Sequence, residues 1–310
     1  MRHLELPFTG PATFLKAPYR ALTEPWRTDV AFLGLPYDFA VGFRPGARFA
    51  PGALRRASGR FAPGSAGFFD LETGGVLLRG VSLVDAGDVD PAQLEYRTSF
   101  ERMTAAAREL RRRATLPVFV GGDHSVSYPL LRAYDDVEDF CVVQLDAHLD
   151  YSDDRNGTRY ANSSPFRRAV EEVLGLKHII VIGLRGLRTN PEAYRAAEVR
   201  GHTLVTARRV RTSLDEVLAL LPKDKKVYLS FDIDVLDPSL APGTGSPEVE
   251  GLDYGEALAL VGAAIQGNEL IGLDVTEVAP NLDPSGLTSL VAARLLAEAV
   301  ALWWRYREVA

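Results

Sequence analysis

The chain contains a series of short apolar segments that do not alternate with polar residues and that end in turn residues. They are rich in Val, Ile, Leu and Phe, and they predict strands at 30–35, 117–120, 140–145, 179–182, 227–231 and 270–275. Strands of this composition are buried on both faces, as in a parallel sheet covered by helices. The pattern therefore predicts a mainly parallel central sheet.

Segments with helical periodicity lie between these strands. They predict helices at 100–113, 126–134, 164–174, 191–200, 213–221, 254–266 and 287–305. Ser213 opens one of them in an S-x-x-E capping pattern with Glu216. Strands that alternate with helices predict a three-layer α/β/α sandwich. We expect a single domain over residues 1–310, with an irregular N-terminal arm over 1–28 and an ordered loop at 61–75.

Composition limits the class of protein. The 310 residues are 46% apolar, and the formal net charge of −6 argues against nucleic-acid binding and slightly favours cationic ligands. The single cysteine, Cys141, excludes a disulfide within the chain and predicts a buried, inert thiol. The N-terminus lacks the apolar core of a signal peptide, and we expect residues 287–304, interrupted by Arg294 and Glu298, to be too short and too charged to span a bilayer. A cytoplasmic enzyme without a membrane partner is the expected class.

Acidic and histidine residues follow four of the predicted strands. The segments read PVFVGGDH (117–124), CVVQLDAHLD (141–150), VYLSFDID (227–234) and LIGLDVTE (270–277). The carboxyl ends of parallel strands meet at one edge of the sheet, where ligands bind in α/β folds. In extended backbone, residues two apart point to the same side. The four segments therefore predict one convergent site.

Six side chains in these segments are candidate metal ligands: His124, Asp146, His148, Asp150, Asp232 and Asp234. Buried carboxylates need a compensating positive charge. Oxygen ligands with some nitrogen and no thiolate favour Mn²⁺ over a structural zinc site. Bridging carboxylates could hold two metals about 3.5–4 Å apart, and such a pair activates water at neutral pH. The alternative is a set of helix caps and turn acids, and Asp123 fits either that role or a position behind His124.

With these motifs in view, the chain resembles the ureohydrolase family of arginases, agmatinases and related guanidino-group hydrolases. The resemblance covers FRPGARFAPGALRRAS (43–58), GGDHSVSYP, QLDAHLD, SFDIDVLDPSLAPGTGSPEVEGL and DVTEVAPNLDPSG. The first of these looks more like the agmatinase branch than the arginase branch. The resemblance implies an arginase-like α/β/α fold, two Mn²⁺ per subunit and a homo-oligomer, often a trimer or hexamer.

The resemblance also implies roles for single residues. One metal would be held by His124, Asp146, Asp150 and Asp232, and the other by Asp146, His148, Asp232 and Asp234. Glu277 would pair with the substrate guanidinium, for which bidentate pairing makes chemical sense. Ser246 stands where the family has a small hydroxyl residue near the guanidinium.

Asn162 departs from the family pattern, because the family usually has a proton-shuttle histidine there. An asparagine cannot titrate, so this branch either works without the shuttle or uses another group. We expect Asn162 to be a residue of the substrate loop, and it leaves a different substrate open.

The implied reaction is hydrolysis of a guanidine to an amine and urea, with Asp150 carrying a proton to the leaving amine. We expect the loop 151–164 to set specificity, since Asp153 and Asp154 could attract an ammonium group while Arg155 and Arg159 could pair with a carboxylate. The favoured substrate is agmatine, which would give putrescine for polyamine biosynthesis. The alternatives are an arginase, a hydrolase of a guanidino acid such as 4-guanidinobutyrate, a non-catalytic metal-binding protein and a metal-dependent deacetylase-like enzyme.

Overall fold

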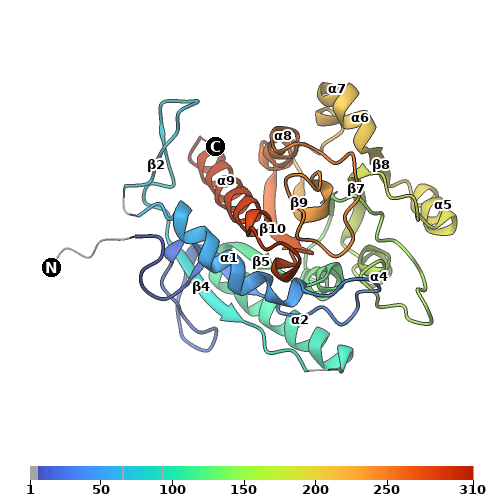
Figure 1. The fold of residues 1–310 in the computed structure, drawn as a ribbon, viewed down its shortest axis with the longest axis horizontal. Coiled ribbons are helices and arrows are strands. Elements are labelled where there is room, and N and C mark those ends of the chain that lie inside the picture. Colours follow the sequence, from blue (N-terminus) through green and yellow to red (C-terminus); the bar gives the residue numbers. More distant parts are fainter. Residues whose placement is uncertain (1–5, 65, 93, 310) are drawn as a thin grey trace.

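A parallel sheet of eight strands forms the centre of the protein (Figure 1). The computed structural model describes residues 6–64, 66–92 and 94–309. The strand order is β4-β1-β5-β10-β9-β6-β7-β8, and all neighbours are parallel. The strands are β1 (Thr28–Gly34), β4 (Leu83–Asp88), β5 (Ala114–Val120), β6 (Phe140–Leu145), β7 (Leu176–Leu184), β8 (Thr203–Thr206), β9 (Lys226–Asp232) and β10 (Glu269–Thr276).

Helices cover both faces of this sheet (Figure 1). They are α1 (Ala50–Ser58), α2 (Tyr96–Arg113), α3 (Ser127–Arg132), α4 (Pro165–Glu172), α5 (Pro191–Val199), α6 (Ala207–Thr212), α7 (Leu214–Leu218), α8 (Tyr254–Ile265) and α9 (Leu287–Val309). One core joins the sheet to α1 and α6–α9, and a second core joins it to α2–α5. Along β1, Val30 and Phe32 enter the first core, while Ala31 and Leu33 enter the second. Successive side chains of a strand point to opposite faces, so the predicted three-layer α/β/α fold is confirmed.

The predicted strands are all present, but the two edge strands were not predicted. β4 contains Asp85, Gly87 and Asp88, and β8 has only four residues, so neither forms a long apolar run. Helices α1 and α6 were not predicted either. α1 has Pro51 in its first turn, where proline is tolerated because that N–H has no helical partner. Within the predicted ordered loop, β2 (Phe68–Phe69) begins a small antiparallel hairpin with β3 (Val76–Leu77).

The capping box forms at a different helix from the one predicted. Ser213 precedes α7, but its side chain makes no capping hydrogen bond. At α8, the Asp253 side chain accepts from the backbone N–H of Glu256, and the Glu256 side chain accepts from the backbone N–H of Asp253. The Ser213 backbone also ends α6, and its φ of −151° and ψ of 50° differ from the extended geometry usual for an N-cap.

Apart from a 3-10 turn at Phe14–Lys16, the N-terminal arm is irregular over residues 6–27, but it packs against the sheet. The Phe14 ring stacks on Phe32 with 4.9 Å between centroids, and the Phe14 N–H donates to Asp85. Arg55 of α1 pairs with the same buried Asp85. The arm is therefore fixed to β1, β4 and α1. The part of the predicted arm at residues 1–5 lies outside the described residues.

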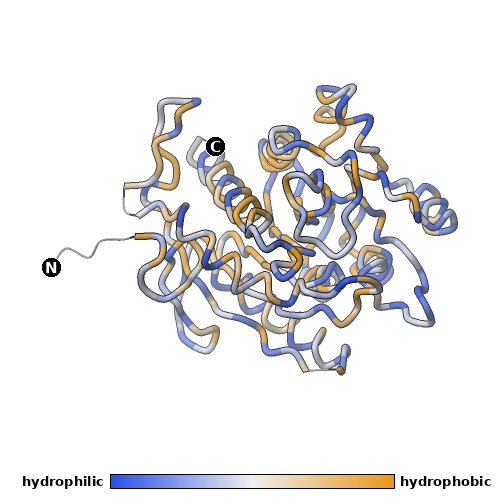
Figure 2. The backbone as a smooth tube through the Cα atoms, in the orientation of Figure 1, coloured by the Kyte–Doolittle hydropathy of each residue, from blue (hydrophilic) through white to orange (hydrophobic). Residues whose placement is uncertain are grey.

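The expectation that the segment of α9 is too short and too charged to span a bilayer was wrong. Among the described residues, the window 287–307 is long and apolar enough by length and composition. However, 61% of an apolar 18-residue window within this helix is buried inside the protein, and Figure 2 shows hydrophobic and hydrophilic residues alternating along α9. Its Leu295, Leu296 and Val300 lie in the core with α1 and α8. α9 thus forms part of the layer that covers one face of the sheet.

Candidate metal centre

The candidate ligands come from the carboxyl ends of three central strands. His124 follows β5, the segment 146–150 follows β6, Asp232 ends β9, and Asp234 lies in the 3-10 turn directly after it. β10 lies between β5 and β9, and it is followed by Glu277. Because these four strands are neighbours and parallel, the four segments meet at one edge of the sheet, as predicted.

The second glycine of the GGDH motif allows a close approach of two backbones. A Cβ at Gly122 would lie 2.0 Å from the carbonyl oxygen of Tyr37, so only glycine fits. Asp123 then caps the turn that carries His124, since its carboxylate accepts from the backbone N–H groups of Ser125 and Ala40. Of the two predicted roles for Asp123, the structure shows the cap, and this cap also ties the segment 37–48 to the site.

Four candidate ligands converge on one point. Nδ1 of His124 lies 3.1 Å from Oδ2 of Asp146, 3.0 Å from Oδ2 of Asp150 and 3.1 Å from Oδ2 of Asp232. All four side chains are buried. None of the three oxygens lies in the direction of a hydrogen bond to Nδ1, which is left without a partner. A buried nitrogen surrounded by three carboxylate oxygens is the donor set of a divalent cation, so these residues fit a metal.

A second group shares Asp146 with the first. Nδ1 of His148 lies 3.0 Å from Oδ2 of Asp234 and 3.6 Å from Oδ1 of Asp146. Oδ1 of Asp232 accepts from the backbone N–H of Asp234, so Asp232 joins the first group through its other oxygen. The geometry thus brings together all six predicted ligands in two overlapping groups. Asp146 is common to both groups, whereas a bridging role for Asp232 stays a prediction.

The pKa shifts of the first ligand group show that its clustered carboxylates need a compensating positive charge. Burial alone lowers the pKa of His124, but the carboxylates of Asp146, Asp150 and Asp232 outweigh it and raise that pKa well above its usual value. Burial and the nearby Asp146 raise the pKa of Asp150 to about 6. Protons compensate the clustered carboxylates here, and a cation would replace them.

A chain of hydrogen bonds lies behind His124. Its Nε2 is 3.0 Å from Oγ of Ser230, whose hydroxyl donates to Asp274 at 2.6 Å. The hydroxyls of Tyr228 and Ser127 also donate to Asp274. Such partners fix the ring and tautomer of a metal-binding histidine. Burial raises the pKa of Asp274, and the three hydroxyl donors offset part of that rise.

Sequence reasoning missed several supporting residues. Gln144 donates to Oδ2 of Asp146 at 2.7 Å, and Glu248 lies 3.7 Å from Nε2 of His148. Gln144 and Ser230 each precede a ligand by two residues and share its side of the strand. A polar residue two positions before a ligand within an apolar strand was the available signal for both. No comparable signal marks Glu248, which lies in a loop far along the chain.

Arg185, which follows β7, forms hydrogen bonds with backbone carbonyl groups of two loops. Its guanidinium donates to the carbonyl oxygens of Asp234, Leu236 and Glu248. It therefore joins the turn that carries Asp234 to the loop that carries Glu248, and it supports the site without lining it.

Glu277 and Asn162 meet beside the first group. Oε1 of Glu277 accepts from the backbone N–H of His124 at 2.9 Å and from Nδ2 of Asn162 at 3.2 Å. Burial and the nearby Asp123 raise the pKa of Glu277 to about 8. Glu277 and Asp150 both have left-handed backbone, with φ of 61° and 49°. Non-glycine residues rarely adopt this conformation, and it is concentrated at functional sites.

The other two predicted substrate residues lie differently. Ser246 is half-buried in the loop that follows Gly245, and the ideal Cβ position of Gly245 is 3.5 Å from Oε2 of Glu277. Asp153 instead pairs with arginines, of which Arg168 at 2.6 Å and Arg159 at 3.1 Å are the nearest. Those arginines lower the pKa of Asp153. Its negative charge is therefore already compensated, which weakens the expectation that it attracts an ammonium group.

The segment 37–48 holds three loops of the site together. Its Ala40 donates to Asp123 and accepts from the backbone N–H of Asn162 at 3.2 Å. Its Arg44 donates to the carbonyl oxygens of Thr244 and Gly245. The FRPGAR motif, which carries part of the family resemblance, thus has a structural role around the candidate centre.

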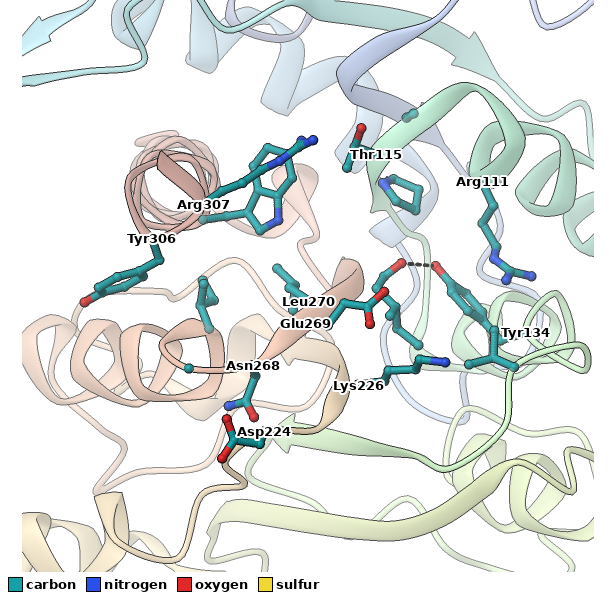
Figure 3. Close-up of a pocket in the computed structure, with 17 residues that line it drawn as sticks. Arg111, Thr115, Tyr134, Asp224, Lys226, Asn268, Glu269, Leu270, Tyr306 and Arg307 are labelled. Atoms are coloured by element: carbon teal, nitrogen blue, oxygen red, sulfur yellow. Dashed lines mark hydrogen bonds between the residues drawn. The ribbon is translucent and has the colours of Figure 1, made fainter. Parts of the chain in front are cut away.

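A cavity of about 660 Å³ opens at the other edge of the sheet, where β5, β9 and β10 begin (Figure 3). Lys226, Glu269 and Arg307 line it, and Figure 3 shows Arg111 beside Tyr134 on one wall. The strands run away from this edge toward the candidate ligands. The cavity is therefore separate from the metal centre.

Comparison with known proteins agrees with this geometry. The model of the arginase family matches residues 28–302. A guanidino acid hydrolase of Homo sapiens is 35% identical over 295 residues, covering 93% of this chain and 82% of that protein. An agmatinase of Gallus gallus is 34% identical over 295 residues, covering 93% of this chain and 84% of that protein. The solved structure of proclavaminate amidino hydrolase from Streptomyces clavuligerus superposes with a TM-score of 0.88 at 32% identity, covering 97% of this chain and 99% of that one. The chain therefore belongs to the arginase family of hydrolases that act on guanidino compounds.

Proposed function

We propose that the protein is a manganese-dependent ureohydrolase that cleaves a guanidine into an amine and urea. The observation that carries this proposal is the position of Glu277, a buried carboxylate that contacts His124 of the first ligand group. A guanidinium paired with Glu277 would present its carbon toward the two ligand groups. Water adds to this carbon, the bond to the substituted nitrogen breaks, and urea and the amine leave.

The proposed ligands of the two metals are the six side chains that converge at the strand ends. His124, Asp146, Asp150 and Asp232 would hold one ion, and His148 and Asp234, with Asp146 and Asp232, the other. Two bound Mn²⁺ would supply Lewis acidity that lowers the pKa of a water molecule to near neutrality. The mixed oxygen and nitrogen donors, without thiolate, favour Mn²⁺.

Two carboxylates have proposed roles in the reaction. Asp150 is the most exposed side chain of the first group, at 9%, and a carboxylate in that position could receive and return a proton. It would pass the proton of the attacking water to the leaving amine. Glu277 would hold the guanidinium in position, which reduces the entropy cost of the attack.

Agmatine is the proposed substrate, and a guanidino acid is the second candidate. The segment 43–58 resembles the agmatinase branch, and the net charge of −6 suits a dication. Around Asp153, however, Arg159, Arg167 and Arg168 outnumber the two acids Asp153 and Glu171. This local excess of positive charge favours a carboxylate at the far end of the substrate.

The test is urea release from agmatine, arginine and 4-guanidinobutyrate by the Mn²⁺-loaded protein, beside a chelated sample. We expect metal-dependent urea from agmatine, and loss of nearly all of it in Glu277→Gln. Urea from 4-guanidinobutyrate alone would support the proposed reaction and show that the substrate is a guanidino acid and not agmatine. No urea from any of them, or acetate from an acetylated polyamine, would overturn the proposal.

We also propose that the protein works in the cytoplasm as a homo-oligomer, a trimer or hexamer, without nucleic-acid or membrane partners. Light scattering of the purified protein gives its mass in solution. A monomer at micromolar concentration would contradict the proposed assembly.

A further inference from the structure

Two unpaired charges of opposite sign line the cavity at the beginning of β9 and β10 (Figure 3). They are the ammonium group of Lys226, the first residue of β9, and the carboxylate of Glu269, the first residue of β10. The two residues are Cα partners in the parallel pairing of these strands. Within the part of the chain that the structure describes, neither side chain forms a hydrogen bond or an ion pair. Both charges are therefore free to bind a ligand.

The alternation of side chains places both charges on the same face of the sheet. Val227 and Leu270, the next residues along each strand, lie in the core that joins the sheet to α1 and α6–α9. Because successive side chains of a strand point to opposite faces, Lys226 and Glu269 point to the face covered by α2–α5. Figure 3 agrees, since it shows both side chains extending toward the side of Tyr134, which belongs to the second core.

The other groups on this wall of the cavity are apolar or already have partners. The Tyr134 hydroxyl donates to the carbonyl oxygen of Ile271 at 2.9 Å. The Arg111 guanidinium lies over the Tyr134 ring, 4.0 Å from its centroid, and pairs with Asp136 at 2.7 Å. The side chains of Val137 and Ile271 add apolar surface. This wall therefore offers one free positive charge, one free negative charge and an apolar surface.

The remaining charged groups of the cavity lie on other walls. Arg307 comes from α9, on the opposite face of the sheet, and its guanidinium lies 3.8 Å from the carboxylate of Asp29. Asp224 lies in the exposed turn before β9, where its backbone N–H donates to Gly267, and Figure 3 shows its side chain beside Asn268. Neither group stands between Lys226 and Glu269.

A ligand that pairs with both free charges carries a carboxylate and an ammonium group, as an amino acid does at neutral pH. A simple anion or cation would leave one of the two charges without a partner. A volume of about 660 Å³ is within the range of small-molecule sites. We propose that this cavity binds a free amino acid with an apolar side chain. Its carboxylate pairs with Lys226, its ammonium group pairs with Glu269, and its side chain packs on Val137 and Ile271.

The experiment measures by calorimetry how three molecules with the same branched carbon skeleton bind to the Mn²⁺-loaded protein. L-Leucine carries both charges, 3-methylbutylamine carries only the ammonium group, and 4-methylpentanoate carries only the carboxylate. We expect saturable binding of L-leucine, with a Kd at least about 10-fold below that of either analogue, because each analogue loses a charge-assisted hydrogen bond. No saturable binding of L-leucine, or equally tight binding of one analogue, would overturn the proposal.

Two variants test the residues. Lys226→Met and Glu269→Gln should each raise the Kd of L-leucine about 10-fold or more, with Tm near that of wild type. The matched controls are Lys223→Met and Glu216→Gln, because these side chains are exposed and do not line the cavity. Both controls should keep the Kd of wild type.

An amino acid could also bind to the metals at the other edge of the sheet. In that case the Kd of L-leucine would be the same in wild type, Lys226→Met and Glu269→Gln, and the proposal would be wrong. The inference goes beyond the proposed function and does not depend on it. A protein that released no urea but bound L-leucine with a Kd that depends on Lys226 and Glu269 would still have this site.

Discussion

Single residues behind the candidate ligands would decide how firmly the site holds a metal. Ser230 connects His124 to Asp274, and its hydroxyl is buried. Ser230→Ala should lower the affinity for Mn²⁺ by about 10- to 100-fold, because His124 loses the partner that orients its ring. A competition titration with a metal-binding dye measures this.

Ser213→Ala is the control for that change, since the Ser213 side chain makes no capping hydrogen bond. Its affinity for Mn²⁺ should equal that of wild type. An equal affinity in Ser230→Ala as well would show that the hydrogen-bond chain does not support the metal.

His202 is a buried histidine away from the metal centre. Its Nδ1 accepts from the Ile179 backbone, and its Nε2 is 3.3 Å from the Tyr151 hydroxyl. Burial, with the nearby His178 and Arg200, lowers the pKa of His202 to about 4. The unfolded chain binds a proton below about pH 6.5 that the folded chain takes up only near pH 4. This residue therefore reduces stability as the pH falls from 6.5 to 4, and it has no such effect above 7.

The corresponding variant is His202→Gln, with Tm measured from pH 8 to pH 5. Between pH 7 and pH 5, Tm should fall less in the variant than in wild type. Parallel curves over that range would refute the assignment.

For single residues, the sequence was a good guide to the candidate ligands that follow buried strands. The position of Asp146, His148 and Asp150 after a buried apolar segment was enough to predict that they lie at one site. The expected extended backbone was wrong, because the three residues follow β6 and Asp150 has a φ of 49°. The sequence was a poor guide for Asp153, because it does not show which arginines surround an acid. The hydrogen bond between Asn162 and Glu277 joins residues 115 apart in the chain, so no local pattern could reveal it.

Among the elements, the helix ends give the clearest prediction. Asp253→Ala should lower the free energy of unfolding by about 1 kcal/mol, because it removes the cap of α8. Ser213→Ala should change it by much less, although the same kind of residue precedes α7. Thermal unfolding of both variants checks this, and an equal loss in the two would contradict it.

The elements themselves were predictable to different degrees. The six inner strands stand out because burial on both faces makes them continuously apolar. β4 and β8 lie at the sheet edges, where polar residues are tolerated, so their signal is weak. The S-x-x-E pattern at Ser213 failed because the preceding helix sets the backbone there, and tertiary structure overrides local preference.

For the whole molecule, the clustered carboxylates link stability to the metal. Removing metal at neutral pH leaves Asp146, Asp150, Asp232 and Asp234 close together, and their repulsion must be offset by protons. Adding Mn²⁺ to the chelated protein should therefore raise Tm. At a free Mn²⁺ concentration of 100 times Kd, each occupied site should add about 2.7 kcal/mol to the free energy of unfolding. Differential scanning calorimetry measures the rise.

Asp146→Asn should lose most of that rise, since Asp146 belongs to both groups. Asp90→Asn, whose side chain is 97% exposed, should keep it. A full rise in Asp146→Asn would place the metal elsewhere.

The links made by segment 37–48 have an evolutionary consequence. The candidate ligands and Glu277 stand on or next to strand ends fixed by the sheet, whereas Asn162 and the Gly245 loop are held in place by contacts with Glu277, Ala40 and Arg44. Substitutions in the loops can therefore change which guanidine fits while the strand ends keep the same chemistry. Natural selection can therefore change the substrate specificity of such an enzyme without changing the residues at its reaction centre.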